Sequence, residues 1–425
     1  MLRTINMSDS RSSLPSSMRY AMGRVPSVSA SSSQRLFAAS NGNTFNAVTN
    51  EIRIPVSAND GFLDVKRGYL AFNLSALAAT DTYDCTLGSD GAGVIDSIRI
   101  ESQGRLLERL ERYCVRHNVR NRLDCSLVAQ NRRSVMLDGP TPALAQPVAG
   151  QTLEATENSY DMVLEIEDSG FLNPHDGMAI PMGAQFDIII RINPTVLQGT
   201  WTTGDPALGL SVINPRFIAP LYKIQNPEAL SAYKTFHQSQ GVSWSGDTYK
   251  CYVGALTQGV TGENIIQIND RSLSLLSLCA VQRTAVDRAY GGTKTTFVPN
   301  GCTEFYYEID GQAHPSSQIK VSAVAATAIL ARAYKEMLNS SFVKDGVGPD
   351  KVSFLANSFV MCADLKVFDD DHLALRGMNT AMNASPNTFN WTASGGATAT
   401  TEVCVFANCE AFWTLQTDGQ ISVVV

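Results

Sequence analysis

Short runs of β-branched and aromatic residues, separated by Gly, Asn, Asp and Pro, recur along almost all of this 425-residue chain. In the first clear run Ile52, Ile54 and Val56 occupy alternate positions, which places their side chains on one face of an extended strand. Many short runs of this kind, with turn residues between them, are typical of antiparallel β-sandwiches. The pattern therefore predicts a chain dominated by β-structure.

The strand-like runs fall in both halves of the chain, and the two halves share the same plan. In the first half they occupy residues 51–56, 62–65, 69–74, 95–100, 160–166, 186–192, 208–213 and 216–222. In the second half they occupy residues 242–253, 265–268, 273–281, 305–309, 352–355, 403–406, 412–415 and 421–425. In each half one run leads to a glycine, Gly104 or Gly311, and a helical pattern comes next, over residues 104–122 and 321–338. Because a chain of this length suits two cores better than one, the repeated order predicts two tandem β-sandwiches.

These patterns divide the chain into three segments. Residues 1–45 are predicted to be a flexible basic arm, residues 46–225 the first sandwich and residues 226–425 the second. At the joint, Asn226 followed by Pro227 is a helix-start signal, because Asn caps free backbone N–H groups and Pro fits the first helical position.

The charge of the chain is unevenly distributed. The first 45 residues carry five Arg and one Asp, or +4, so the remaining residues carry −11 of the total of −7. This segment shows no helical or strand period, and a Ser-rich segment of this kind cannot bury enough apolar surface to offset its ordering entropy. A basic arm on an acidic body predicts contacts with phosphates, lipid headgroups or acidic protein. The predicted contact residues are Arg3, Arg11, Arg19, Arg24 and Arg35.

The nine cysteines are odd in number and include no C-x-x-C pair. Scattered free thiols favour a reducing compartment, without a zinc site or a disulfide framework. The N-terminus has no apolar signal-peptide core, and the longest weakly polar stretch, residues 321–331, is too short to span a membrane. No cofactor is expected.

Two clusters could carry chemistry, and each also has a plainer interpretation. Residues 369–372, Asp-Asp-Asp-His, could bind a hard cation, but we interpret them as a solvated turn. His117 and Cys114 lie three positions apart on the first predicted helix, where they could touch as a base and a nucleophile. Because Arg112, Arg116, Arg120 and Arg122 surround them, we predict instead a basic face that contacts another subunit or an acidic neighbour.

Several segments resemble double jelly-roll major capsid proteins. The run at residues 59–72, NDGFLDVKRGYLAF, looks like the opening strands of that family, and Ile95-x-x-Ile98-x-Ile100-x-x-x-Gly104 is similar to the segment after those strands in the family. In the second half Gln282-Arg283-Thr284, and Asn300 leading to Tyr307-x-Ile309-x-Gly311 with Pro315 after it, resemble the second barrel, especially that of Polinton-like viruses. Each motif is loose, and the resemblance spans roughly residues 50–425.

The resemblance implies two tandem eight-stranded antiparallel jelly rolls with short helices in their loops. It also implies a non-enzymatic major capsid protein whose homotrimers form pseudo-hexameric capsomers, as in adenoviruses and tailless membrane-containing phages. The implied partners are neighbouring capsomers and minor or penton capsid proteins in the virion, after assembly in the host cytoplasm or nucleus. For the arm, an inner membrane, the genome and a neighbouring capsid protein all stay open. The longest expected loops, residues 137–157 and 378–401, are candidates for capsomer surfaces.

Two other classes of function compete with this interpretation. A carbohydrate-binding or adhesin-like β-sandwich protein fits the strand pattern but leaves the duplicated plan unexplained. A jelly-roll glycoside hydrolase requires two carboxyl groups ~5–10 Å apart in a cleft, and sequence alone places no such pair.

Overall fold

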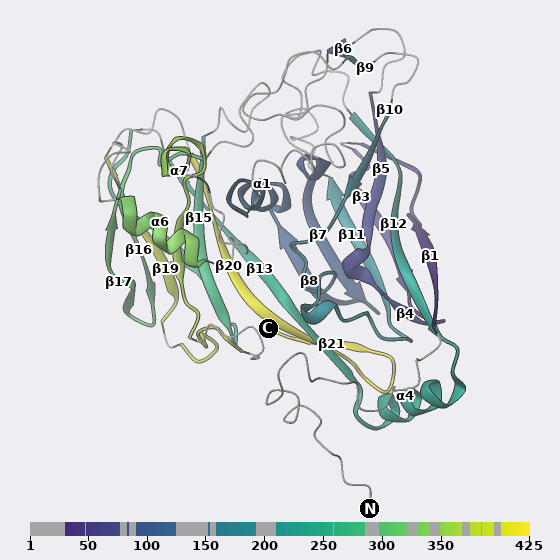
Figure 1. The fold of residues 1–425 in the computed structure, drawn as a ribbon. Coiled ribbons are helices and arrows are strands. Elements are labelled where there is room, and N and C mark those ends of the chain that lie inside the picture. Colours follow the sequence, from purple (N-terminus) through teal and green to yellow (C-terminus); the bar gives the residue numbers. More distant parts are fainter. Residues whose placement is uncertain are drawn as a thin grey trace, which may run out of the picture.

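The computed structural model describes residues 30–46, 48–76, 83–84, 91–124, 152–153, 159–192, 210–257, 259–284, 297–321, 330–340, 349, 351–367, 375–383, 385–394 and 401–425. Within them the chain forms two β-sandwiches that stand side by side, with helix α1 at the junction and helix α4 at one end (Figure 1). Among these described residues no helix is long and apolar enough to cross a membrane.

The first sandwich consists of two antiparallel sheets. One sheet has the order β1 (Ala30–Ala38), β12 (Leu210–Ile224), β5 (Tyr69–Ala76) and β10 (Ser159–Leu164), and β2 (Thr44–Phe45) and β4 (Phe62–Leu63) also pair with β12. The other has the order β3 (Glu51–Ser57), β11 (Gln185–Ile192), β7 (Ile95–Ser102) and β8 (Arg105–Glu111). A separate ribbon joins β6 (Tyr83–Asp84) to β9 (Thr152–Leu153).

The second sandwich repeats this arrangement. One sheet has the order β13 (Val242–Leu256), β20 (Thr401–Leu415), β15 (Leu275–Thr284) and β18 (Met361–Asp364), with β21 (Ile421–Val424) paired to β20. The other has the order β14 (Thr261–Ile268), β19 (Asn387–Ser394), β16 (Cys302–Ile309) and β17 (Gln312–Lys320).

The strand order identifies the topology. Numbered along the chain within each sandwich, the main strands pair as 1-8-3-6 in one sheet and 2-7-4-5 in the other, and both sandwiches have this order. This is the eight-stranded jelly roll, which closes two sheets over one core and limits exposed edges. The predicted fold of two tandem eight-stranded jelly rolls is therefore confirmed.

The helices lie between strands or at the joint. They are α1 (Tyr113–Asp124), α4 (Pro227–Gln240), α6 (Leu330–Asn339) and α7 (Lys351–Asn357), with short 3-10 turns at Val65–Arg67, Gly91–Val94 and His175–Gly177. The predicted cap is confirmed, because the Asn226 side chain accepts hydrogen bonds from the backbone N–H groups of Glu228 and Ala229. Helix α4 therefore begins at the predicted joint between the jelly rolls.

The strand periodicity agrees with burial. In β3 the side chains of Ile52, Ile54 and Val56 are buried, and the residues between them are exposed or half-buried. The same alternation buries Phe305, Tyr307 and Ile309 in β16. Aliphatic and aromatic side chains from both sheets of each sandwich fill its core.

The helix predicted over residues 104–122 is wrong in its first part. Residues 105–111 form strand β8, which pairs with β7 through a two-residue turn in which Gln103 and Gly104 both have positive φ. A mirror-image turn of this kind matches the twist of the two strands, so the chain reverses there. Asp310 and Gly311 make the same turn between β16 and β17. The two glycines therefore do mark equivalent places in the halves, but each is followed by a strand before any helix.

Three further predictions differ from the structure. Residues 352–355, predicted as a strand, lie in helix α7. The loop predicted over residues 378–401 contains strand β19. In the second predicted helix, residues 330–338 are helical, and residues 322–329 lie outside the described residues.

Part of the segment predicted to be a flexible arm forms a strand. Residues 30–38 form strand β1, which pairs along its whole length with β12, from Ala30 opposite Ile224 to Ala38 opposite Arg216. The prediction of a flexible segment is therefore wrong for these residues, because backbone pairing with β12 orders a Ser-rich sequence that has little apolar surface of its own. Residues 1–29 lie outside the described residues.

Candidate assembly interface at the junction of the jelly rolls

The backbones of the two jelly rolls meet at a pair of glycines. Strand β8 of the first lies against β13 of the second, and a Cβ atom on Gly246 of β13 would lie 2.2 Å from the carbonyl oxygen of Gly170. A Cβ on Gly170 would in turn lie 2.7 Å from the carbonyl oxygen of Asp247. Only glycine permits this approach, because real Cβ atoms essentially never come within 3.0 Å of backbone.

Aromatic side chains seal the same junction. The ring of Phe171, from the first jelly roll, packs edge-on against Trp244 and Trp413 of the second, with ring centroids 5.5 Å apart in both pairs. Trp413 also donates a hydrogen bond from Nε1 to the backbone carbonyl of Leu107, at 3.3 Å. Edge-to-face pairs of this kind add stability beyond the area they bury, so the junction resembles a domain core.

Helix α1 spans the junction and contacts the second jelly roll through arginines. The guanidinium of Arg116 lies 4.3 Å from the ring centroid of Tyr249, and its Nη1 donates a short hydrogen bond to the side-chain oxygen of Asn408. Arg112, which immediately precedes the helix, forms an ion pair with Glu402, with 2.9 Å between Nη2 and Oε1. A desolvated guanidinium over an aromatic face is an attractive arrangement.

The basic face predicted for this helix has an acidic neighbour within the same chain. Arg120 Nη1 lies 2.9 Å and Arg116 Nε 3.4 Å from Oδ1 of Asp168. Burial of Asp168 opposes its ionisation, but the two guanidiniums outweigh burial and hold its pKa well below the ordinary value. A buried cluster of this kind links parts of one chain, so the prediction of an acidic neighbour is confirmed, and that neighbour is not another subunit.

The pairing considered for Cys114 and His117 does not form. The Nδ1 atom of His117 lies 3.8 Å from a carboxylate oxygen of Asp168, and its Nε2 atom lies 2.9 Å from the amide nitrogen of Asn121. Burial raises the pKa of the Cys114 thiol to about 11, so this thiol stays protonated and is a poor nucleophile.

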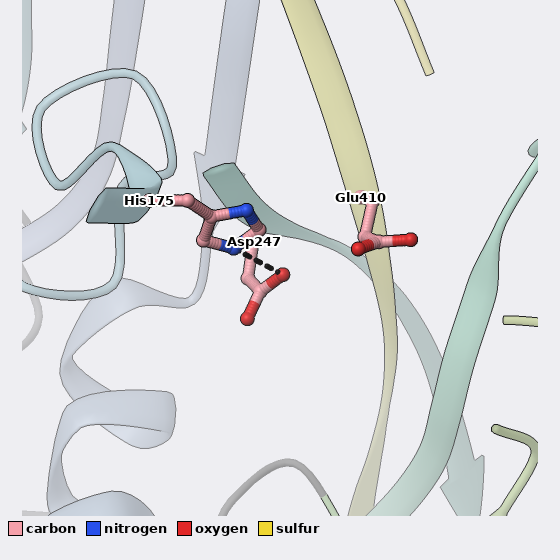
Figure 2. A group of neighbouring side chains, drawn as sticks. All are labelled: His175, Asp247 and Glu410. Carbon is pink, nitrogen blue, oxygen red and sulfur yellow. Dashed lines mark hydrogen bonds and ion pairs between the residues drawn. The ribbon is translucent and has the colours of Figure 1, made fainter. Parts of the chain in front are cut away.

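A second polar cluster crosses the junction and contains His175, Asp247 and Glu410 (Figure 2). Nε2 of His175, from the first jelly roll, lies 2.9 Å from Oδ1 of Asp247 in β13. The donor set could hold a metal ion, but the guanidinium of Arg376 already bonds both carboxylates, at 3.2 Å to Asp247 and 2.9 Å to Glu410. A cation is thus supplied by the chain itself, and the contact between His175 and Asp247 links the two jelly rolls.

Glu108 is a buried carboxyl group at the same junction. It accepts hydrogen bonds from the hydroxyl of Ser169 and, at 2.9 Å, from the backbone N–H of Gly170. Burial raises its pKa to about 7, since these hydrogen bonds only partly compensate for the lost water. Sequence reasoning missed Glu108 because a helix over this segment would put it on the exposed side, whereas in β8 it is buried and bonded to Ser169 and Gly170.

The other predicted site residues are mostly outside the described residues. Only Arg35 of the five arm arginines is described, and it is an exposed residue of β1 whose Nη2 lies 3.3 Å from Oδ2 of Asp60. Arg3, Arg11, Arg19 and Arg24 lie outside the described residues, as does the Asp-Asp-Asp-His cluster at residues 369–372.

Comparison with protein-family models finds no match, and comparison with curated proteins finds none either. Solved structures do match. VP54 of PBCV-1, fitted into a cryo-EM reconstruction of the virophage Sputnik, is 9% identical with a TM-score of 0.66, over 96% of this chain and 99% of that chain. The Faustovirus major capsid protein is 11% identical with a TM-score of 0.61, over 93% and 92% of the two chains. The mavirus major capsid protein is 10% identical with a TM-score of 0.52, over 97% and 93%. This chain therefore has the double jelly-roll fold of these viral major capsid proteins.

Proposed function

We propose that this chain is the major capsid protein of an icosahedral virus and that three copies form a pseudo-hexameric capsomer. The role is structural and non-enzymatic. The observation that carries the proposal is the side-to-side contact between two jelly rolls of identical strand order, together with the likeness of the whole chain to capsid proteins.

The argument for a trimer rests on how the jelly rolls contact each other. The fifth strand of the first jelly roll, β8, faces the first strand of the second, β13, so the contact joins two different surfaces. The equivalent strands at the outer ends of the chain are β17 and β1. A contact between unlike surfaces can repeat until a ring closes. Three chains with two jelly rolls each would close a ring of six by pairing β17 of one copy with β1 of the next.

Burial supports this pairing. In β13, Trp244 and Tyr249 are only 3% and 1% exposed, and both contact the first jelly roll, Trp244 through Phe171 and Tyr249 through the carbonyl of Glu111. In β1, residues 31–36 are all exposed, and Leu36 is 57% exposed. Strand β17 is also largely exposed, including Ala313 at its start. The equivalent surfaces are thus covered where the jelly rolls meet within the chain and uncovered at its two ends.

Helix α6 supports the same arrangement. Helix α1, after β8, is buried on nearly all sides by the junction. Helix α6 comes after β17 at the equivalent place, and it buries Ala333 and Met337 but leaves Arg332 and Lys335 exposed. We propose that the exposed side of α6 lies over the junction with the next copy, as α1 does within the chain.

Further parts of the proposal concern partners and location. The capsomer would contact neighbouring capsomers and minor capsid proteins in the virion, with assembly in the host cytoplasm or nucleus. Residues 1–29 carry four of the arm arginines and are proposed to contact an inner membrane, the genome or another capsid protein.

The test is the oligomeric state of edge-strand variants, measured by light scattering. We expect Leu36→Asp and Ala313→Asp to shift the protein from trimer to monomer without loss of β-structure, because each places a charge in the proposed contact. Met382→Asp is the matched control: this side chain is 91% exposed, lies in a turn on neither strand, and should leave the trimer intact. A folded wild-type monomer would contradict the proposal and would redirect attention to the carbohydrate-binding alternative.

A further inference from the structure

Two cysteines face each other across neighbouring strands in the core of the second jelly roll. Cys279 lies in β15 and Cys362 in β18, and the strand register places them directly opposite each other. Both are free thiols with none of their surface exposed. Strand β18 has four residues and lies at the edge of its sheet, paired with β15 alone on the main path.

The hydrogen-bond pattern shows which kind of pair this is. The backbone N–H of Leu365 donates to the carbonyl of Leu276, its direct partner in the extended register, at 2.9 Å. In an antiparallel ladder, hydrogen-bonded and non-hydrogen-bonded pairs alternate. Cys279 and Cys362 lie three positions along the ladder from the hydrogen-bonded pair of Leu276 and Leu365, so they form a non-hydrogen-bonded pair. In such a pair the Cα atoms are about 4.5 Å apart and the side chains approach closely. That separation lies within the range that a disulfide bridges.

The two thiols already touch. Burial, followed by a hydrogen bond from the neighbouring Cys279, raises the pKa of Cys362 well above the ordinary value for a thiol. Cys362 is therefore protonated in the folded protein and is a poor nucleophile while it stays buried.

A second thiol contact in the same sheet has different geometry and serves as an internal contrast. Cys251 of β13 hydrogen-bonds with Cys404 of β20, which raises the pKa of Cys251. However, Cys251 is opposite Phe406, and Cys404 is opposite Val253, so the two cysteines are diagonal neighbours. Diagonal Cα atoms are about 7–8 Å apart, which exceeds the reach of a disulfide without backbone movement.

We propose that Cys279 and Cys362 are an oxidation site that closes to a disulfide when the folded protein leaves a reducing compartment. In exchange with a low-molecular-weight disulfide such as oxidised glutathione, the two protein thiols transfer two electrons and two protons to that disulfide. One S–S bond forms between the strands, and the glutathione disulfide is reduced to two glutathione thiols. The exchange requires brief opening of β18, because both thiols are buried.

The bridge would fasten the edge of the sheet. It would tie β18 to β15 and close the chain segment that contains β16, β17, α6 and α7. A cross-link that closes a long segment restricts the unfolded chain and thereby stabilises the folded state. The inference concerns the second jelly roll alone and does not depend on the proposed capsid role.

The test is to incubate the purified full chain with oxidised glutathione just below its melting temperature, block remaining thiols in denaturant, and map peptides without reduction. We expect a linked peptide pair joining Cys279 to Cys362, no link between Cys251 and Cys404, and a melting temperature several degrees higher that returns to its starting value after reduction. The variant Cys362→Ala should lose this gain, and the control Cys404→Ala should keep it.

Two results would overturn the inference. One is full alkylation of all cysteines, or glutathione attached to them, after the incubation. The other is a bridge between Cys251 and Cys404 in yield equal to that between Cys279 and Cys362. The linked peptides and melting temperatures of the oxidised and reduced wild-type protein test the proposed disulfide even where a variant fails to fold.

Discussion

The close contact between Gly170 and Gly246 predicts that adding a single methyl group at Gly246 will destabilise the junction of the two jelly rolls. In Gly246→Ala the new Cβ would lie 2.2 Å from the carbonyl oxygen of Gly170, whereas ordinary contact begins near 3.4 Å. The two jelly rolls would have to separate by about 1.2 Å, the difference between these distances. Both contacting groups are backbone, so no side-chain rotation can relieve the clash. Overpacking of this kind costs about 1–3 kcal/mol.

The separation would also loosen the packing around the glycines. Phe171 packs on Trp244 and Trp413 beside them, so we expect Gly246→Ala to lower the melting temperature and to change the intrinsic tryptophan fluorescence of the native protein. Thermal unfolding followed by tryptophan emission measures both effects.

A control variant in the same strand separates this effect from a general cost of alanine in β13. In Gly254→Ala the new Cβ meets only the side chain of Ile266, at 2.4 Å. A side chain can shift a χ angle by about 30° from its rotamer at a cost of about 0.5–1.5 kcal/mol. Replacing Gly in a strand recovers roughly 0.5–1 kcal/mol. We therefore expect Gly254→Ala to be nearly neutral. Equal stability of Gly246→Ala and wild type, with unchanged fluorescence, would refute the glycine contact between the jelly rolls.

Three further outcomes are expected from the described contacts. The pKa of Glu108 is raised in the folded protein to about 7 from 4.5. The protonated carboxyl therefore stabilises the fold below pH 4.5, and this contribution is lost as pH rises through 7. Urea titrations should show the free energy of unfolding of the wild type, relative to Glu108→Gln, falling by on the order of 3 kcal/mol over that pH range. Asn226→Ala removes the cap of helix α4 and should cost about 1 kcal/mol in urea unfolding, while Ser231→Ala on the exposed side of the same helix should cost nothing measurable. Arg376→Gln leaves the buried carboxylate of Glu410 without its cation and should lower the free energy of unfolding by about 3–5 kcal/mol. Calcium or EDTA should leave the melting temperature of the wild type unchanged. A large shift with calcium would mean that a metal ion displaces the guanidinium.

The class of fold was predictable from sequence because strand periodicity is local. Ile52, Ile54 and Val56 show one buried face without any knowledge of their partners. The duplicated plan was also visible, because Gly104 and Gly311 occupy equivalent turns. The cap at Asn226 was predictable for the same reason, since it depends on its next few residues alone.

The errors came from strand pairings that the hydrophobic period of a single segment does not reveal. Leu107 and Leu110 fit a helical period, yet the two-residue turn at Gly104 pairs their strand with β7, and the Asp-Gly pair at the equivalent turn in the second half was the signal that could have revealed it. Strand β1 has too few apolar residues to be recognised from sequence, because backbone pairing with β12 orders it in their place.

The candidate site was harder to predict than the fold. Glu108, Gly170 and Gly246 acquire their roles only where the two jelly rolls meet. A glycine in a strand and a carboxylate beside leucines carry no local mark of such a junction. The opposition of Cys279 and Cys362 likewise depends on strand register, which a single sequence does not determine.

The central claim is that the side-to-side contact of two jelly rolls continues between copies of the chain. The most direct measurement is the mass of the purified wild-type protein by light scattering, with electron microscopy of the same fractions. A trimer of the 45.9 kDa chain with a hexagonal outline is the predicted result. A stable folded monomer at high concentration, with no larger assembly, would contradict it.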